Sequence, residues 1–219
     1  MKHLFTILFA VVALSSNAQF IKKLSLDVSV GGRFAGAISD SYYASYTPGS
    51  DSVKAVLSPG IHVDGGVRYQ LNELISLRGG ISFDRFNTTI SGFPDSTNDN
   101  SSLTSLSIES VINLKEFKFM SFIPEKMGLN FHGGFGLSFL SNTKFKEAKE
   151  FKGSDEMINI IFGLTPQYNL NDKISINLDM ACRLLLLQTY YVNPNQDGTP
   201  PSKNMSNIFN LSVGATYRF

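Results

Sequence analysis

The sequence predicts an all-β fold, an eight-stranded antiparallel up-and-down transmembrane β-barrel. Three observations lead to this fold class. Apolar and polar residues alternate with a period of two along most of the chain, short and long connections follow one another in turn, and arginine and lysine occupy different positions. The 219 residues suffice for one domain, and we expect a signal peptide at 1–18 followed by a barrel domain at 19–219.

The N-terminal segment has the pattern of a cleaved secretory signal. Lys2 precedes the apolar run LFTILFAVVAL, and the small residues Ser16 and Ala18 follow where signal peptidase cuts. The alternative is a short anchor helix, but the run is well below the ~20 residues that span a bilayer. We therefore expect export, with the outer membrane as the destination if the later segments form a barrel.

Eight segments beyond the signal alternate in polarity, and no apolar run among them reaches the length of a transmembrane helix. Each segment is longer than the about 9 to 11 residues with which a tilted strand crosses a bilayer. The predicted strands lie at 23–37, 53–69, 74–88, 103–119, 127–140, 156–169, 173–188 and 206–219.

The connections between these segments alternate strictly in length. Three are short and carry turn-forming Asn, Asp, Glu or Pro, at 70–74, 121–126 and 169–173. Four are long and polar, at 38–51, 89–102, 141–155 and 189–205. Tight periplasmic turns and long outer loops are what an up-and-down membrane barrel requires, with both chain ends on the periplasmic side.

Each strand segment separates an apolar face from a polar face. In LSLDVSV the leucines and valines share one face, whereas Asp27 lies on the other face with two serines. Charges of both signs gather on the polar faces, and we predict that they form a charge network in the barrel lumen. The predicted members are Asp27, Arg33, Asp64, Arg68, Arg78, Asp84, Glu109, Asp179, Arg183 and Arg218.

The basic residues distinguish a membrane barrel from its rival, a soluble secreted barrel with an apolar interior. Every arginine lies within a strand segment, whereas the lysines lie in the signal, near strand ends, in turns or in loops. Arginine suits paired, partly desolvated sites because its planar group binds carboxylates through two bonds. An arginine that faces lipid costs roughly 2–4 kcal/mol. The distribution therefore favours charges in the lumen, with only Arg85 out of phase, near the rim.

Aromatic residues are frequent near the strand ends, where the interfacial girdles of membrane barrels lie. Ordinary β-propensity explains part of this pattern, and the girdle is the interpretation that we favour. The residues concerned are Phe34, Tyr69, Phe83, Phe86, Phe139, Tyr168, Tyr190 and Tyr217.

Four phrases carry a resemblance to a known family: SIESVINLKEFKFM, GLNFHGGFGLSFL, YNLNDKISINLD and the final TYRF. Together with the signal and the eight alternating segments, they resemble the outer-membrane β-barrels of Bacteroidota, small eight-stranded relatives of the OmpA transmembrane domain. The resemblance implies that the barrel-assembly machinery recognises the aromatic C-terminal strand during biogenesis. By resemblance, Phe209, Tyr217 and Phe219 form this assembly signal.

The sequence contains no pattern that indicates catalysis, and we expect no catalytic residue, cofactor or metal. The glycine-rich GGFG and VGGRF are not phosphate loops, because no helix follows either of them. His62, Asp64 and His132 lack the compact spacing of a metal site, and hydrogen-bonded lumen histidines are the favoured interpretation. Cys182 lies in an apolar strand and is the only cysteine.

We therefore expect a non-enzymatic barrel with a structural or surface-interaction role through its four long outer loops. The alternatives are narrow passive transport of small or apolar solutes and an accessory role in an envelope secretion or gliding machine. The expected partners are outer-membrane lipid and lipopolysaccharide, the barrel-assembly machinery, and a protein partner at the outer loops. A net charge of +1 disfavours nucleic acid.

Overall fold

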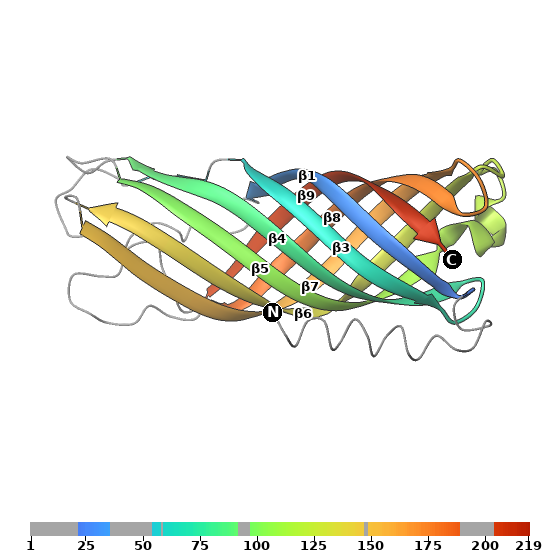
Figure 1. Ribbon diagram of the computed structural model, residues 1–219, viewed down its shortest axis with the longest axis horizontal. Helices are drawn as coiled ribbons and strands as arrows, with labels where there is room; N and C mark the ends of the chain where they lie inside the picture. Colours follow the sequence, from blue (N-terminus) through green and yellow to red (C-terminus); the bar gives the residue numbers. More distant parts are fainter. Residues whose placement is uncertain (1–21, 36–53, 58, 92–96, 147–148, 189–203) are drawn as a thin grey trace.

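The computed structural model describes residues 22–35, 54–57, 59–91, 97–146, 149–188 and 204–219. In these residues the chain forms a single β-sheet that closes on itself as a tilted barrel (Figure 1). The predicted signal peptide at 1–18 lies outside the described residues. No helix in the described part of the chain is long and apolar enough to cross a membrane.

Every neighbouring pair of strands in the barrel is antiparallel. β1 pairs with β9 at the closure, and β4 pairs with β5 to complete the ring. The strands are β1 (Leu24–Ala35), β2 (Lys54–Leu57), β3 (Gly60–Gln70), β4 (Ile75–Ser91), β5 (Thr97–Asn113), β6 (Met127–Lys146), β7 (Lys149–Asn169), β8 (Ile174–Gln188) and β9 (Asn204–Arg218). The predicted fold class is confirmed.

The short strand β2 continues β3 along the same edge of β4. Leu57 pairs with Thr88, and Ile61 pairs with Arg85. The chain thus advances four residues from β2 to β3 while β4 advances three, which leaves one extra residue opposite β4. Pro59 lies between the two strands and has no N–H to donate to a ladder. Because β2 and β3 occupy one strand position in the barrel, the nine labelled strands form an eight-stranded barrel with one irregularity between β2 and β3. This agrees with the predicted number of strands.

Two of the four predicted long loops are largely strand, so this part of the prediction is wrong. β4 and β5 stay paired as far as Ile90 and Thr97, and β6 and β7 stay paired as far as Lys146 and Lys149. A polar sequence favours a loop, yet an antiparallel pair satisfies its backbone hydrogen bonds without any apolar face. The predicted loops at 38–51 and 189–205 lie almost wholly outside the described residues.

The predicted strand 103–119 is also too long. β5 ends at Asn113, whose side chain accepts a hydrogen bond from the backbone N–H of Lys115 at 3.2 Å and caps a 3₁₀ turn, η3 (Leu114–Glu116). A second turn, η4 (Lys118–Met120), follows. The alternating phenylalanines of this stretch imitate a strand, but the capped turns divert the chain and make a connection of 114–126.

The other two short connections are tight turns of the same kind. Asn72 Oδ1 accepts hydrogen bonds from the backbone N–H groups of Leu74 (2.9 Å) and Ile75 (2.7 Å). Asn171 Oδ1 does the same with Lys173 (2.9 Å) and Ile174 (2.8 Å). These asparagine turns fix the hairpins of the end that also carries the C terminus, and we call it the turn end; the opposite end is the loop end (Figure 1).

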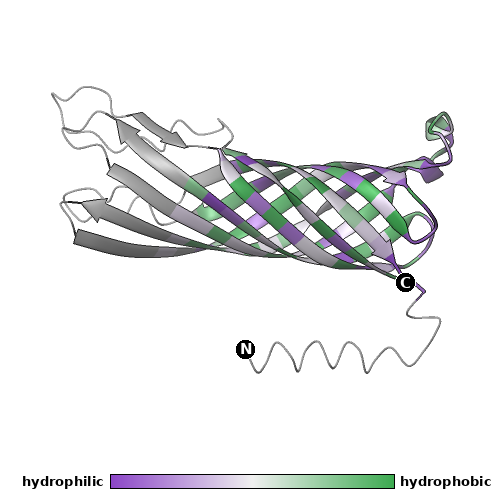
Figure 2. Cartoon of the chain, turned by 45° about the horizontal axis from the view of Figure 1, so that its top comes forward, coloured by the Kyte–Doolittle hydropathy of each residue, from purple (hydrophilic) through white to green (hydrophobic). Residues whose placement is uncertain are grey.

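The barrel wall has an apolar outer face and a mostly polar inner face, the reverse of the arrangement in a soluble protein. Outward residues are apolar and exposed, as in Ile108 (67%) and Phe135 (69%), whereas inward polar residues such as Asp84 and Asn159 are fully buried. Figure 2 shows hydrophobic and hydrophilic residues alternating along the strands. Since a soluble barrel turns its apolar face inward, this pattern rules out the soluble rival and leaves an apolar belt that faces lipid.

Candidate functional site in the barrel lumen

Arg78 is the centre of an ion-pair cluster in the turn-end half of the lumen. Its Nη1 donates to Glu109 at 2.9 Å, its Nε donates to Asp27 at 3.3 Å, and its Nη2 donates to Asp64. Arg68 donates to the same Asp27 oxygen at 2.9 Å. Four strands thus contribute to one hub, because their inward positions meet at the same height in the barrel.

Two glycines make room for the Arg78 side chain. Gly66 and Gly80 pair across β3 and β4 and face inward. A methyl group added at Gly66 would lie 2.7 Å from Arg78 Nε, and one at Gly80 would lie 2.7 Å from Nη1. The glycine pair therefore serves close approach of the guanidinium to the wall.

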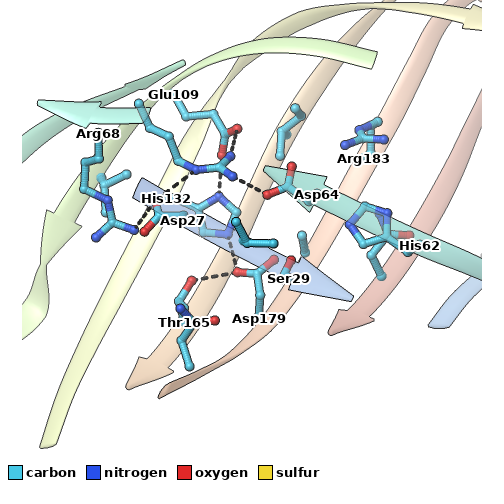
Figure 3. A pocket seen from close by; sticks show the side chains of 17 residues that line it. Asp27, Ser29, His62, Asp64, Arg68, Glu109, His132, Thr165, Asp179 and Arg183 are labelled. Atoms are coloured by element: carbon cyan, nitrogen blue, oxygen red, sulfur yellow. Dashed lines mark hydrogen bonds and ion pairs between the residues drawn. The ribbon is translucent and has the colours of Figure 1, made fainter. Parts of the chain in front are cut away.

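His132 extends this cluster across the barrel. Its Nδ1 lies 2.7 Å from Glu109, and its Nε2 lies 3.1 Å from Asp179, within ion-pair distance. Thr165 donates to the same Asp179 carboxylate at 2.7 Å. Figure 3 shows these side chains converging from several strands. The histidine joins two carboxylates that no direct contact connects.

A second cluster lies in the middle of the lumen. His62 Nδ1 is 2.8 Å from Asp84, and Arg183 Nη1 donates to the other oxygen of Asp84 at 3.2 Å. Arg183 also donates to Ser82 at 2.8 Å and to Ser105 at 3.2 Å. Asp84 is fully buried, so these partners compensate the desolvation of its charge.

An apolar cluster lies in the loop-end part of the described lumen. It consists of the buried side chains of Phe86, Leu103, Met157, Leu185 and Ile208. The guanidinium of Arg33 stacks over the Phe86 ring, 3.4 Å from its centre. Phe86 is therefore a lumen residue, and its predicted place in the outer girdle is wrong. It has the same parity along β4 as Asp84, and that parity, not proximity to the strand end, decides its face.

Between the polar clusters lies a cavity of about 50 Å³. Its lining includes Asp64, Arg78, His132 and Asp179. This volume has room for a few water molecules and no larger ligand. The interior of an eight-stranded barrel is just wide enough for side chains to fill.

The structure divides the predicted charge network into groups. It brings Asp27, Asp64, Arg68, Arg78, Glu109 and Asp179 together in the first cluster and Asp84 and Arg183 in the second. Arg33 stacks on the ring of Phe86. Arg218 does not join either cluster, because it lies at the turn end, where it donates to Asn169 at 3.0 Å and to the Asp172 carbonyl at 3.5 Å.

The two histidines do not assemble into a site with Asp64. His62 bonds Asp84, and His132 bonds Glu109 and Asp179. Among the described residues, no group of three or more His, Cys, Asp or Glu side chains is placed to hold a metal ion. Sequence reasoning did not predict that His132 and the lumen serines, threonines and asparagines connect the charged residues to one another. The available signal was their position at every second residue, on the inward face of the strands.

The aromatic residues of the C-terminal strand face outward. Phe209, Tyr217 and Phe219 are 42%, 40% and 51% exposed, and the last two rings meet edge to face with centres 5.1 Å apart. The backbone N–H of Phe219 donates to Leu24 at 3.2 Å, so the pairing of the two terminal strands holds to the end of the chain.

No protein-family model and no curated protein matches the sequence. Solved structures do match in fold. A major outer membrane protein from Thermus thermophilus has 12% identity and a TM-score of 0.52, with 90% of this chain and 99% of that chain covered. The outer membrane protein OprG from Pseudomonas aeruginosa has 10% identity and a TM-score of 0.51, with coverages of 89% and 95%.

The attachment invasion locus protein Ail of Yersinia pestis, in complex with the heparin analogue sucrose octasulfate, has 12% identity and a TM-score of 0.50 over 90% of this chain and 99% of that chain. At such identities these likenesses show the fold. The chain is thus a closed, eight-stranded antiparallel β-barrel with the architecture of small outer-membrane proteins.

Proposed function

We propose that this protein is an integral outer-membrane β-barrel, exported by the signal at 1–18, with a structural or surface-interaction role at its loop end. One observation carries the proposal: the barrel is inverted, with apolar side chains outside and ion pairs inside. Such a wall is stable where lipid surrounds it. The resemblance to Bacteroidota barrels and the assembly part of Phe209, Tyr217 and Phe219 remain predictions.

A filled lumen directs function toward the surface. The polar clusters and the apolar residues at the loop end occupy the described interior, which leaves no wide aqueous path. The β6–β7 hairpin extends the wall as paired strands up to Lys146 and Lys149 and offers a rigid scaffold for recognition. Lipopolysaccharide and a protein partner are the ligands that this end would meet.

Extraction and heat-modifiability test the membrane part of the proposal. The full chain, expressed with its signal in a Gram-negative host, is expected in the outer-membrane fraction and soluble only with detergent. Unboiled samples should migrate faster on a denaturing gel than boiled ones, because the closed barrel resists the detergent. A protein released into the periplasm without detergent would contradict the proposal.

Binding at the loop end is tested with sucrose octasulfate as a first probe, because Ail was crystallised with this heparin analogue. The variant replaces Lys144, Lys146, Lys149 and Lys152 of the β6–β7 hairpin with glutamine. The control replaces Lys22, Lys23, Lys118 and Lys126 at the turn end. Recognition at the loop end predicts that only the hairpin variant loses binding. Equal loss in both variants would indicate a non-specific charge effect and contradict it.

Passive transport of small solutes is the second candidate, since the polar cavity holds a few water molecules inside the lumen. Conductance of single proteins in planar bilayers distinguishes passive transport from a surface-interaction role. A filled lumen predicts no conductance above background. Steady conductance that changes when Leu103 is replaced by alanine would favour transport instead.

A further inference from the structure

All three turn-end connections expose large apolar side chains. Leu71 (52% exposed) and Leu170 (53%) occupy the two tight turns, and Phe119 (68%) and Phe122 (76%) occupy the connection 114–126. Phe122 is more exposed than the belt residues Ile108 (67%) and Phe135 (69%), and Phe119 is as exposed as these two within two percentage points. Exposed apolar side chains at every turn of one rim mark a surface that contacts a partner or a membrane.

The connection 114–126 is held in a fixed shape. The ammonium group of Lys115 donates to three backbone carbonyls, those of Pro124 (3.1 Å), Glu125 (2.9 Å) and Met127 (3.3 Å). The rings of Phe117 and Phe119 pack with centres 5.5 Å apart. Figure 2 shows this connection projecting beyond the barrel rim at the turn end. The phenylalanines therefore sit on an ordered projection, and we call 114–126 the wedge.

The turn tips continue the lipid-facing surface of the strands. Leu71 has the parity of the outward residues Val67 and Tyr69, and Leu170 has the parity of Tyr168, two positions earlier. The wedge lies between Ile112 and Met127, which face outward as well. Outward apolar residues thus extend to the strand ends next to all three connections.

Distance places these tips in the headgroup zone of the bilayer. Two residues of strand advance about 7 Å, which is about 5 Å along the membrane normal at a tilt of roughly 40°. The interfacial zone of each leaflet is about 5–8 Å thick beyond the hydrocarbon core. If Tyr69 and Tyr168 mark the edge of the hydrocarbon core, Leu71 and Leu170 lie within this interfacial zone and not beyond it.

The wedge also carries cations. Lys118 and Lys126 are exposed, as are Glu116 and Glu125, whereas Lys115 is occupied by the carbonyls. Lys118 lies between Phe117 and Phe119 in the sequence, and Glu116 accepts a hydrogen bond from Asn113 at 3.2 Å. Apolar rings flanked by lysines fit the boundary between acyl chains and phosphate groups.

We propose that the wedge inserts Phe119 and Phe122 into the headgroup boundary of the lipid leaflet at the turn end, with Lys118 and Lys126 against the phosphates of anionic phospholipids. The proposal rests on the membrane insertion of the barrel. It assigns the turn end a lipid-binding surface, with Leu71 and Leu170 as minor contacts on the same rim.

Tryptophan fluorescence tests this insertion, since the chain contains no tryptophan. The full-length variants Phe119→Trp and Phe122→Trp each provide one probe, and Phe135→Trp provides a reference inside the belt. The variants are reconstituted in phosphatidylcholine vesicles, with and without phosphatidylglycerol, and with lipids brominated near the glycerol end of the chains. Insertion predicts blue-shifted emission at 119 and 122, loss of intensity with the brominated lipids, and little quenching by aqueous iodide.

The outcomes separate the two proposals. If Trp at position 135 is quenched by iodide and not by brominated lipid, the barrel is not inserted and the proposed function fails. If position 135 reports lipid while 119 and 122 both emit as in water and are quenched by iodide, the wedge is not lipid-bound and this inference is wrong. A partner protein would then be the remaining cover.

The lysines are tested in the same samples. Phosphatidylglycerol should increase the blue shift at position 122, and Lys118→Gln with Lys126→Gln should remove that increase. The same pair of substitutions should leave the emission at position 135 unchanged. An increase that persists without both lysines would contradict the assigned phosphate contacts.

Discussion

At the scale of single residues, the lumen depends on Arg78. This side chain contacts three carboxylates. Arg78, Asp27 and Glu109 are buried, and the Asp64 side chain is 18% exposed. A buried ion pair contributes little net stability against an apolar replacement, but loss of one partner leaves the others charged and unpaired. The positive charge of Arg78 therefore allows Asp27, Asp64 and Glu109 to lie close together inside the barrel.

Arg78→Gln should lower the free energy of unfolding by about 3–5 kcal/mol, because it leaves carboxylates without their cation. The measurement is urea unfolding of the protein refolded in lipid vesicles. Arg85→Gln is the matched control, since Arg85 is exposed on the outward face of the same strand; we expect a change within about 0.5 kcal/mol. Equal effects of the two substitutions would refute the hub.

Gly80→Ala should destabilise the barrel by about 1–3 kcal/mol, because its methyl group meets Arg78 Nη1 at 2.7 Å and Ser107 Oγ at 2.8 Å. Gly79→Ala is the control, because nothing lies within 4 Å of a methyl group there. Unfolding midpoints in urea compare the two. A Gly79 variant as unstable as the Gly80 variant would show that strand propensity, and not space for the guanidinium, explains the glycine.

At the scale of elements, the terminal strands determine closure. β1 and β9 pair from Ser25 and Arg218 at the turn end to Ala35 and Ile208 at the loop end. Closure pairs β1 with β9, which would otherwise be open edges of the sheet, and so protects these two strands from pairing with other chains. The outward Phe219 adds an edge-to-face contact with Tyr217 and one backbone hydrogen bond to Leu24, beyond the last residue pair of Ser25 with Arg218.

Deletion of Phe219 should therefore separate assembly from stability. In cells we expect a clear loss of the heat-modifiable, folded form, because the assembly machinery recognises the C-terminal aromatic in the family that the sequence resembles. In vitro, the deleted protein should refold into detergent micelles with nearly unchanged yield. Phe139→Ala on β6 is a control for the loss of one exposed aromatic. Normal assembly of the deleted chain in cells would contradict the assembly signal.

Element boundaries show the limit of pattern reasoning. Asp27, Asp84 and Arg183, which parity along each strand places on the inner face, are buried in the structure. The end of β5 was missed because FKF continues the alternation, while the cap made by Asn113 ends the strand. The hairpin extensions beyond Thr88 and Leu140 were missed because the polarity of a segment carries no signal for its backbone pairing.

At the scale of the whole molecule, the apolar belt determines where the barrel is stable. Outward residues such as Val30, Ile108 and Phe135 are more than half exposed on a protein whose interior is polar. In water this surface would promote aggregation, whereas in lipid it needs no cover. The belt and the wedge together give the molecule its lipid-facing surface.

Ile108→Arg should destabilise the barrel in phosphatidylcholine vesicles by about 2–4 kcal/mol, because it places a charge near the bilayer midplane. Leu26→Arg, nearer the turn end on β1, should cost only about 0–1 kcal/mol, because the side chain reaches the interface. Unfolding free energies from urea titration give both values. A neutral Ile108 variant would mean that this face does not meet lipid.

The sequence by itself determined the class of the molecule: the number of strands, the side of each strand that carries charge, and the contrast between lumen arginines and peripheral lysines. These are local properties, since a period of two assigns a face without knowledge of any partner. Parity also held the signal for the apolar cluster of Phe86, Leu103 and Ile208, which a search for charges alone passed over.

Only the tertiary structure decided which charge meets which. Arg183 and Asp84 are 99 residues apart in the chain, and their contact depends on the stagger accumulated across the strands between them. Tertiary structure also set Arg218 apart from the network and turned 114–126 into a rigid wedge through the contacts of Lys115. Periodicity specifies the direction of a side chain, whereas the register of the closed barrel specifies its neighbours.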